Sequence, residues 1–463
     1  MKKDPFASLA AEALATDPRI EQAKKLLLEA VKAHQKGLTE VKPANPALKQ
    51  QYDELLAVFA ECRGSKLWFP YIGSGIGHGP FVELMDGSVK YDFINGIGPH
   101  YLGHSHPALI SASIDAALSD TIMQGQLQQN YDSVELVTLL CQASKMEHCF
   151  LTTSGAMAND NALKIAFQKR YPAYRVLAFD HNFSGRSLAL TSVTDKPAYR
   201  EGIPPFGYVD YVPFFDATNP EESTQRAVEV LQKHLSRHPK EYAVMCFELV
   251  QGEGGFYPGS KEFFTAIMRI LKENNVSIFI DEIQTFGRTP ALFAFQYFGL
   301  EEFADIVSIG KLTQVCATLF NKDHRPRPGL LSQTFTGSTS AIRAAKVILH
   351  ELIHGNYYGP EGKIAKLHLY FAEKLAKLSK RHPKLIQGPF GVGAMIAFTP
   401  FDGNAQRTTQ FIHDLFQAGV MSFIAGNNPS RVRFLIPAGI VTTKDIDAVV
   451  DIIETTLTNE TMP

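Results

Sequence analysis

The sequence predicts an α/β fold built around a largely parallel β-sheet. Strand-like runs, each followed by a loop and a helix-like stretch, alternate between about residues 90 and 310. The runs 174–179, 242–247 and 276–280 are short and rich in β-branched and aromatic residues, as buried parallel strands are. Polar residues cluster directly after several of these runs, at the edge where open α/β sheets bind their ligands.

Composition limits the possible functions. The 463 residues suffice for two domains or for one large domain with a satellite, and 45% hydrophobic with 20% charged residues describe an ordinary globular protein. A formal net charge of -2 gives no support to nucleic-acid or membrane binding. Five scattered cysteines argue against a disulfide scaffold or a zinc ribbon. Without a signal-peptide pattern or an apolar run of about 18 residues, we expect a cytoplasmic protein.

Residues 1–70 predict two peripheral amphipathic helices. Apolar residues recur at helical spacing from Ile20 to Val31 and from Leu48 to Phe59, and packing explains both stretches. The glycines of residues 73–79 are reminiscent of a nucleotide loop, but a dinucleotide fingerprint opens a helix, whereas residues 80–88 predict a hairpin. We therefore expect residues 73–79 to form a flexible loop.

Three histidines, His100, His104 and His106, precede a predicted helix over residues 108–118. No carboxylate or cysteine accompanies them at ligand spacing, so we expect a structural turn and no metal site.

Side chains at two strand ends predict carbonyl-cofactor chemistry. Asp281 and Gln284 follow the run 276–280, and Lys311 follows the next run, 304–309. A lysine beside a carboxylate at such strand ends suits a Schiff-base enzyme, in which the lysine holds a carbonyl cofactor and the acid tunes its ring. A surface lysine and a helix-capping acid are the alternative interpretation of these residues taken alone.

Two further segments offer groups for anions and aromatic rings. Ser154, Gly155 and Ala156 open a predicted helix, whose free N–H groups and dipole suit a phosphate monoester. Phe183 and Arg186 lie three apart in a later loop, where they could supply a stacking face and a carboxylate fork. A core phenylalanine and a surface arginine are the alternative.

The C-terminal part predicts a small α+β domain. Helices are expected from residues 341–350, from 363–379 and from Thr443 onward, with strands near 393–398 and 431–437.

Taken in order, these motifs resemble those of the class III pyridoxal-phosphate aminotransferases over about residues 70–455. Locally, residues 310–316 and 185–191 are most similar to the L-lysine ε-aminotransferases of that class. The matching pieces are Gly103–Pro107, Ser154–Lys164, Phe183–Arg186, Glu248–Gly255, Asp281–Thr285, Gly310–Lys311, Thr334–Phe335 and Arg433–Phe434.

The resemblance implies a fold-type I architecture. It consists of a large domain, with a mostly parallel seven-stranded sheet sandwiched by helices, and a small α+β domain. We place the large, pyridoxal-phosphate-binding domain at residues 86–345 and the C-terminal small domain at 346–463. Residues 1–85 are then an N-terminal helical segment that contributes to the small domain. A homodimer with active sites at the interface is also implied.

The resemblance also implies the roles of the residues around the cofactor ring. Lys311 would form the Schiff base with pyridoxal 5'-phosphate and later shuttle a proton. Asp281 would pair with the pyridine nitrogen and keep it protonated. Gln284 would hydrogen-bond the phenolic oxygen, and Phe183 would stack on the ring.

Phosphate binding is assigned by the same resemblance. The Gly155 and Ala156 backbone amides, with Ser154 nearby, would hold the phosphate, and Thr334 would reach it from the neighbouring subunit.

Substrate binding resembles a dual-specificity device of three residues. Arg186 would bind the distal carboxylate of an ω-amino donor, and Arg433 would bind the α-carboxylate of 2-oxoglutarate. Glu253 would neutralise Arg433 while the donor is bound. Leu249 and Ser184 depart from the usual residues of the family and bear on the substrate more than on the cofactor.

We therefore predict transamination from an ω-amino group, that of the L-lysine ε-carbon first, to 2-oxoglutarate, giving a semialdehyde and glutamate. N-acetylornithine, ornithine and 4-aminobutyrate are the alternative donors. A racemase or aminomutase on the same fold, a catalytically dead relative and a dinucleotide oxidoreductase are the other classes considered. Lys311 and Asp281 are both present, which argues against the dead relative.

Overall fold

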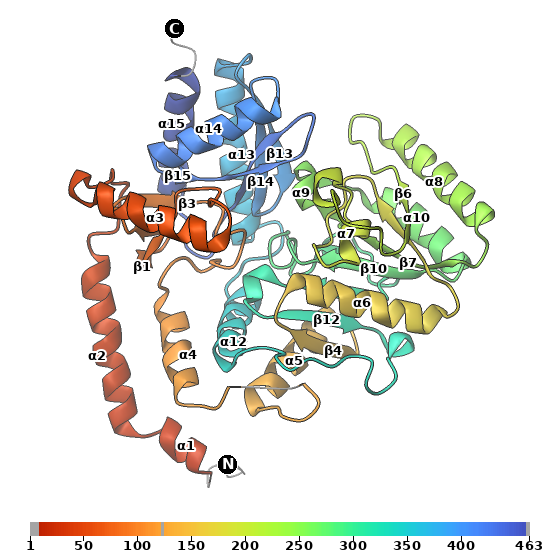
Figure 1. The fold of residues 1–463 in the computed structure, drawn as a ribbon, viewed down its shortest axis with the longest axis horizontal. Coiled ribbons are helices and arrows are strands. Elements are labelled where there is room, and N and C mark those ends of the chain that lie inside the picture. Colours follow the sequence, from red (N-terminus) through yellow and green to blue (C-terminus); the bar gives the residue numbers. More distant parts are fainter. Residues whose placement is uncertain (1–8, 122–124, 460–463) are drawn as a thin grey trace.

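The computed structural model describes residues 9–121 and 125–459. Figure 1 shows a larger α/β unit beside a smaller one, with the N-terminal helices extending along one side. In the larger unit, a seven-stranded sheet has one strand, β12, antiparallel to both its neighbours, while the remaining neighbours are parallel. The predicted α/β class with a mostly parallel sheet is therefore confirmed. In spatial order the strands are β4 (His148–Thr152), β12 (Cys316–Phe320), β11 (Ile306–Ile309), β10 (Ser277–Glu282), β7 (Tyr242–Phe247), β5 (Arg175–Phe179) and β6 (Tyr208–Val212).

Helices cover this sheet because each buries an apolar stripe on it. Helix α6 packs across β4, β12, β11, β10 and β7, while α10 packs on β10 and α8 on β6. Strands β7, β10, β11 and β12 are buried along their whole length, as their apolar composition predicts. The helices of the larger unit are α4 (Pro107–Ala117), α5 (Tyr131–Ser144), α6 (Gly155–Arg170), α7 (Leu190–Val193), α8 (Pro220–Arg237), α9 (Gly252–Gly255), α10 (Lys261–Glu273), α11 (Ala294–Tyr297) and α12 (Thr339–His354).

The smaller unit contains an antiparallel sheet of order β13-β14-β17-β16, on which α13 and α14 pack, and α15 packs against these two helices. A second sheet of order β1-β2-β3-β15 joins an N-terminal and a C-terminal segment of the chain, because β15 pairs parallel to β3. The domain boundaries stay a prediction. The elements are β1 (Gly73–His78), β2 (Phe81–Leu84), β3 (Val89–Asp92), β13 (Ile386–Val392), β14 (Met395–Pro400), β15 (Val420–Met421), β16 (Phe423–Ala425), β17 (Arg431–Leu435), α13 (Lys363–Arg381), α14 (Ala405–Ala418) and α15 (Thr443–Asn459).

The expected flexible loop at residues 73–79 is wrong. Residues 73–78 form strand β1, which pairs antiparallel with β2. The glycines serve close packing, since a Cβ atom at Gly77 would lie 2.4 Å from the His104 Cβ and 2.5 Å from the Phe81 carbonyl oxygen. The predicted hairpin that follows is confirmed by the antiparallel pairing of β2 with β3.

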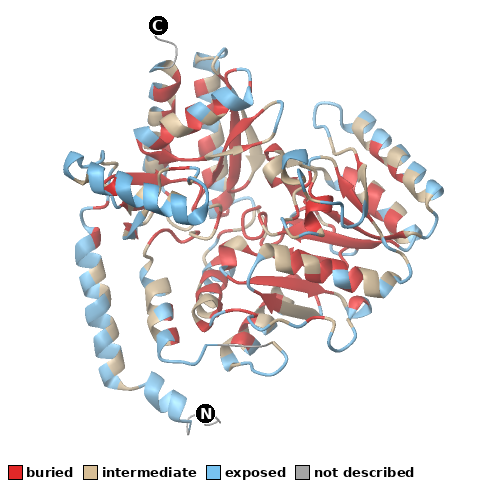
Figure 2. Ribbon diagram, in the orientation of Figure 1, coloured by how far each residue is buried: buried red, intermediate tan, exposed pale blue. Residues whose placement is uncertain are grey.

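The two predicted N-terminal helices form as α2 (Pro18–Gln35) and α3 (Lys49–Arg63), and a short helix that was not predicted, α1 (Ala10–Ala15), precedes them; all three bury little apolar surface. Asp17 caps α2 by accepting the Arg19 N–H at 2.8 Å. Figure 2 shows α1 and α2 mostly exposed. Leu27 of α2 is 50% exposed and Phe59 of α3 is 46% exposed. The expected packing of both stretches is thus only partly found within one chain. Among the described residues, no helix is both long and apolar enough to cross a membrane.

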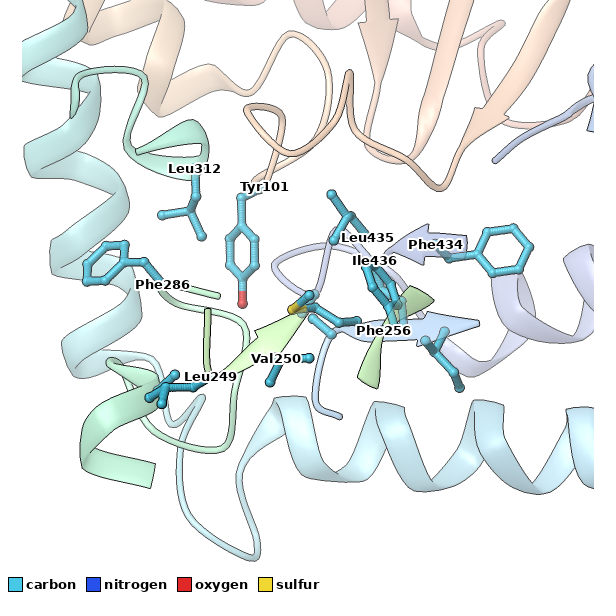
Figure 3. Close-up of a cluster of buried hydrophobic side chains, with 14 of the residues drawn as sticks. Tyr101, Leu249, Val250, Phe256, Phe286, Leu312, Phe434, Leu435 and Ile436 are labelled. Carbon is cyan, nitrogen blue, oxygen red and sulfur yellow. The ribbon is translucent and has the colours of Figure 1, made fainter. Parts of the chain in front are cut away.

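An apolar cluster connects the two units. Figure 3 shows Leu312, Phe286, Leu249, Phe256 and Phe434 in this cluster, together with Tyr101, Val250, Leu435 and Ile436. Each of the first five is a neighbour or near neighbour in sequence of a polar site residue. The cluster therefore fixes the backbone from which the polar side chains of the site project.

Candidate active site

Three neighbouring parallel strands, β7, β10 and β11, end at one edge of the large sheet. The register pairs Phe247 with Ile280, so Glu248 and Asp281 follow side by side, and Lys311 comes two residues after the end of β11. These residues border one cavity of about 210 Å³. Its lining residues are Gly155, Ala156, Asn159, Phe183, Ser184, Gly185, Glu248, Asp281, Ile283, Gln284 and Lys311.

Asp281 is a buried carboxylate held in one orientation. Its Oδ2 accepts a hydrogen bond from Asn159 Nδ2 at 2.6 Å, and its Oδ1 accepts one from the Ile283 N–H at 2.9 Å. Burial raises the pKa of Asp281 despite these bonds. A cation placed against this carboxylate, such as a protonated ring nitrogen, would offset that effect.

Lys311 presents a buried amine in an unusual backbone conformation. Its φ is 53°, in the left-handed region that favours glycine, and it follows Gly310, where a Cβ would lie 2.6 Å from Cys316 Sγ. Burial, together with the charges of Arg433 and Arg288, lowers the pKa of Lys311 to about 8, although Glu253 acts in the opposite direction. Its Nζ makes no hydrogen bond or ion pair with the residues that the structure describes, which suits a nucleophilic amine.

The start of α6 forms another part of the cavity wall. Ser154 caps this helix, because its Oγ accepts the Met157 N–H at 3.2 Å. Gly155 and Ala156 line the cavity at the first turn, where helix N–H groups lack partners within the helix. These N–H groups and the dipole of a 16-residue helix favour an anion.

A buried arginine is joined to the cavity through Gln284. Arg433 is 0% exposed, forms an ion pair with Glu253 through Nη2, and donates from Nη1 to Gln284 Oε1 at 3.2 Å. Burial acts to raise the pKa of Glu253, but Arg433 and Lys311 outweigh it and lower the pKa. Glu253 therefore neutralises Arg433 as an ionised carboxylate.

The remaining predicted residues lie outside the cavity lining. Arg186 is exposed, and its guanidinium lies 3.7 Å from the centre of the Tyr199 ring. Tyr199 in turn makes an edge contact with Phe183, so Arg186 belongs to the rim on the Phe183 side. Thr334 is exposed and is not among the residues that border the cavity of its own chain.

Two residues of the site, Asn159 and Glu248, had no role in the sequence analysis. Asn159 lies one helical turn after Gly155, and this spacing within the segment Ser154–Lys164 was the available sequence signal for it. Glu248 follows β7 directly, and Asp281 is the last residue but one of β10, so the position of Glu248 after a buried strand was an available signal.

The three histidines form no metal site. His104 Nε2 contacts Asp92 Oδ2 at 2.9 Å, and His100 stacks on His104 at 4.3 Å. Within residues 9–121 and 125–459, no group of histidine, cysteine and acidic side chains has an arrangement that could hold a metal ion.

The residues around the cavity fit pyridoxal phosphate. Lys311 offers an unpaired amine for the aldehyde, Asp281 offers a buried carboxylate for the ring nitrogen, and the N–H groups of Gly155 and Ala156 offer donors for the phosphate. Phe183 borders the same space and supplies the aromatic face. The donor set is thus complete for each part of that cofactor.

Comparison with known proteins agrees with this chemistry. Acetylornithine aminotransferase of Caldanaerobacter subterraneus is 28% identical over 396 residues, which cover 82% of this chain and 93% of the relative. That of Methanocaldococcus jannaschii is 28% identical over 409 residues, covering 82% and 92%. Among solved structures, lysine aminotransferase from M. tuberculosis has a TM-score of 0.77 at 24% identity, covering 88% of this chain and 100% of the other.

The fold and the site define a pyridoxal-phosphate enzyme of fold type I. Residues 74–457 match the family described as aminotransferase class-III, and the chain belongs to that family. Its members depend on pyridoxal phosphate and transfer an amino group from a donor to a keto acid.

Proposed function

We propose that this enzyme transfers an ω-amino group to 2-oxoglutarate, with the ε-amino group of L-lysine as the leading donor. The proposal rests above all on the buried Arg433–Glu253 pair beside Gln284. With the pair closed, the site accepts a donor whose reacting carbon bears no carboxylate. Once Glu253 moves aside, Arg433 can bind the α-carboxylate of 2-oxoglutarate through a two-pronged contact.

Arg186 is the proposed partner of the carboxylate at the far end of the donor. Its guanidinium lies on Tyr199, and Tyr199 contacts Phe183 at the wall of the cavity. L-Lysine carries its α-carboxylate far from the ε-amine, so a rim arginine can bind one end while Lys311 acts at the other.

The side chains around the reacting atoms have distinct tasks. Pyridoxal phosphate, when bound, supplies an electron sink for the electrons released at the donor carbon. Lys311 Nζ holds the cofactor and afterwards moves the proton between the donor carbon and the cofactor. Asp281 keeps the ring nitrogen protonated, Gln284 binds the phenolic oxygen, and Gly155 and Ala156 hold the phosphate.

The proposed functional unit is a homodimer. The exposed Thr334 lies outside the cavity of its own chain, which supports its proposed contact with the phosphate in the partner's site. The cytoplasmic location stays a prediction.

N-acetylornithine is the second candidate donor. Relatives at 28–29% identity that cover about four fifths of this chain carry the name acetylornithine aminotransferase. N-acetylornithine also has an ω-amine and a distal α-carboxylate, so it satisfies the same two arginines. Ornithine and 4-aminobutyrate follow it.

The test is a half-reaction. The cofactor-loaded protein is mixed with L-lysine alone, and the visible absorbance of the bound cofactor is followed, with Lys311→Ala as the control. We expect the visible band to disappear and to return when 2-oxoglutarate is added. If the band is stable with L-lysine but is bleached by N-acetylornithine or 4-aminobutyrate, the compound that bleaches it replaces L-lysine as the proposed donor. A wild-type protein with no band would contradict the assignment of Lys311.

A further inference from the structure

A second buried carboxyl group, Glu248, lies beside Asp281 in the cavity wall. Glu248 follows β7 directly, is 6% exposed and lines the cavity. Its Oε1 accepts the backbone N–H of Phe183 at 3.1 Å, and its Oε2 accepts that of Gly252 at 2.9 Å. One side chain thus ties the segment that carries Phe183 to the turn that carries Glu253.

The two segments that Glu248 joins lead to the two carboxylate-binding arginines. Phe183 contacts Tyr199, on which Arg186 lies, whereas the turn after Gly252 places Glu253 against Arg433. Phe183 and Gly252 are far apart in sequence, and Glu248 hydrogen-bonds to both. Glu248 therefore connects the segment that leads to Arg186 with the turn that leads to Arg433. These two arginines are the proposed partners of the carboxylate groups of the substrates.

The position requires a carboxyl group rather than any polar side chain of similar size. Two separate acceptor oxygens face two backbone N–H groups, and an amide would present its NH₂ donor to one of them. Burial raises the pKa of Glu248 to about 8, and Asp281 acts in the same direction. Keeping two carboxyl groups next to each other in a buried wall is unfavourable, so a role is needed to explain it.

We propose that Glu248 is a positioning residue that fixes the Phe183 segment relative to the Glu253 turn. The Phe183 ring, which faces the cofactor, and the Glu253 carboxylate, which neutralises Arg433, are thereby held in fixed positions relative to each other. Binding of a carboxylate at Arg433, which displaces Glu253, is thereby transmitted to the environment of the ring. This inference rests on the roles given to these residues in the proposed function.

Glu282 offers a matched control for Glu248. It is 0% exposed, burial raises its pKa to about 8, and its carboxylate likewise accepts two backbone N–H groups, from Ala294 at 2.7 Å and Phe295 at 2.8 Å. Its partners, however, belong to α11 rather than to the two segments joined by Glu248. The same substitution at both positions makes the same chemical change in two places.

The experiment compares Glu248→Gln with Glu282→Gln in the cofactor-loaded enzyme. Thermal unfolding, circular dichroism in the visible band of the cofactor and its response to glutarate, an unreactive dicarboxylate, are measured. We expect both variants to lose thermal stability. Only Glu248→Gln should change the visible circular dichroism, and it should weaken the response to glutarate about fivefold or more.

Matching visible spectra and glutarate responses in the two variants would overturn the proposal. If Glu248→Gln does not fold, Glu248→Asp takes its place, because it keeps the charge but is too short to reach both N–H groups. A wild-type spectrum and glutarate response in Glu248→Asp would then overturn the proposal as well. Failure of the proposed function is distinct: it appears in the wild-type enzyme as no amino transfer from L-lysine, whatever Glu248 does.

Discussion

At the scale of single residues, the site depends on side chains that hold other groups in place as well as on those proposed to contact the cofactor. Lys311, Asp281 and Gln284 stand in short local motifs after strands, and the structure places all three at one cavity. Asn159 and Glu248 lie within the matching segments Ser154–Lys164 and Glu248–Gly255, but the sequence alone assigned no role to either. Asn159 donates a hydrogen bond to Asp281, and Glu248 accepts the N–H groups of the nearby Gly252 and of the distant Phe183. The long-range bonds exist only once the chain has folded.

The buried amine of Lys311 predicts how the apoenzyme captures its cofactor. Burial lowers the pKa of Lys311 to about 8, and only the neutral form of the amine is a nucleophile. The capture rate should rise about tenfold per pH unit below about pH 8 and level off above it. A lysine of ordinary pKa would give rates that still rise near pH 10, because its neutral fraction is still growing there.

The measurement is the rate at which the visible band appears after pyridoxal phosphate is added to apoenzyme, between about pH 6 and about pH 10. Nα-acetyl-lysine, a free amine, is the reference. Parallel pH profiles for the protein and this reference would contradict the lowered pKa of Lys311.

At the scale of elements, strands and helices of the core were predictable because their burial leaves a pattern in the sequence. The run 242–247 forms β7 with the same bounds, and the helix expected after Ser154 is α6. Residues 73–79 were misjudged, since glycines that allow close packing look the same in sequence as glycines that allow motion. The difference lies in the neighbours of Gly77, which are distant in sequence or in another strand.

The start of α6 predicts separate effects on stability and cofactor binding. Ser154→Ala removes the cap to the Met157 N–H and should lower the free energy of unfolding by about 1 kcal/mol. Ser260 caps α10 in the same way, through the Phe263 N–H at 3.1 Å, so Ser260→Ala should cost about as much. Only Ser154→Ala should also raise the dissociation constant for pyridoxal phosphate, because only α6 opens at the cavity.

Denaturant unfolding gives the first quantity and fluorescence titration of apoenzyme gives the second. Equal dissociation constants for pyridoxal phosphate in the two variants would show that the Ser154 cap does not contribute to phosphate binding.

At the scale of the whole molecule, the sequence could not distinguish burial within one chain from burial against another. The spacing of apolar residues in α2 and α3 predicted packing, yet Leu27 and Phe59 stay about half exposed. Both helices lie before the region that matches the family, which starts at residue 74. A hydrophobic stripe in a sequence predicts that its residues are buried. It does not tell whether the surface that covers them belongs to the same chain or to another one.

The proposed sharing of sites between subunits predicts complementation between two inactive variants. Lys311→Ala removes the amine, and Thr334→Arg should block the phosphate of whichever site Thr334 reaches. If Thr334 serves the partner, a mixed dimer has one doubly damaged site and one intact site, made of Lys311 from one chain and Thr334 from the other. Mixed dimers, isolated through two different affinity tags after co-expression, should therefore regain cofactor binding and half-reaction activity at one site per dimer.

If Thr334 serves its own chain, each chain of the mixed dimer keeps its own defect, and no activity returns. The exposed position of Thr334, outside the cavity of its own chain, favours the first outcome.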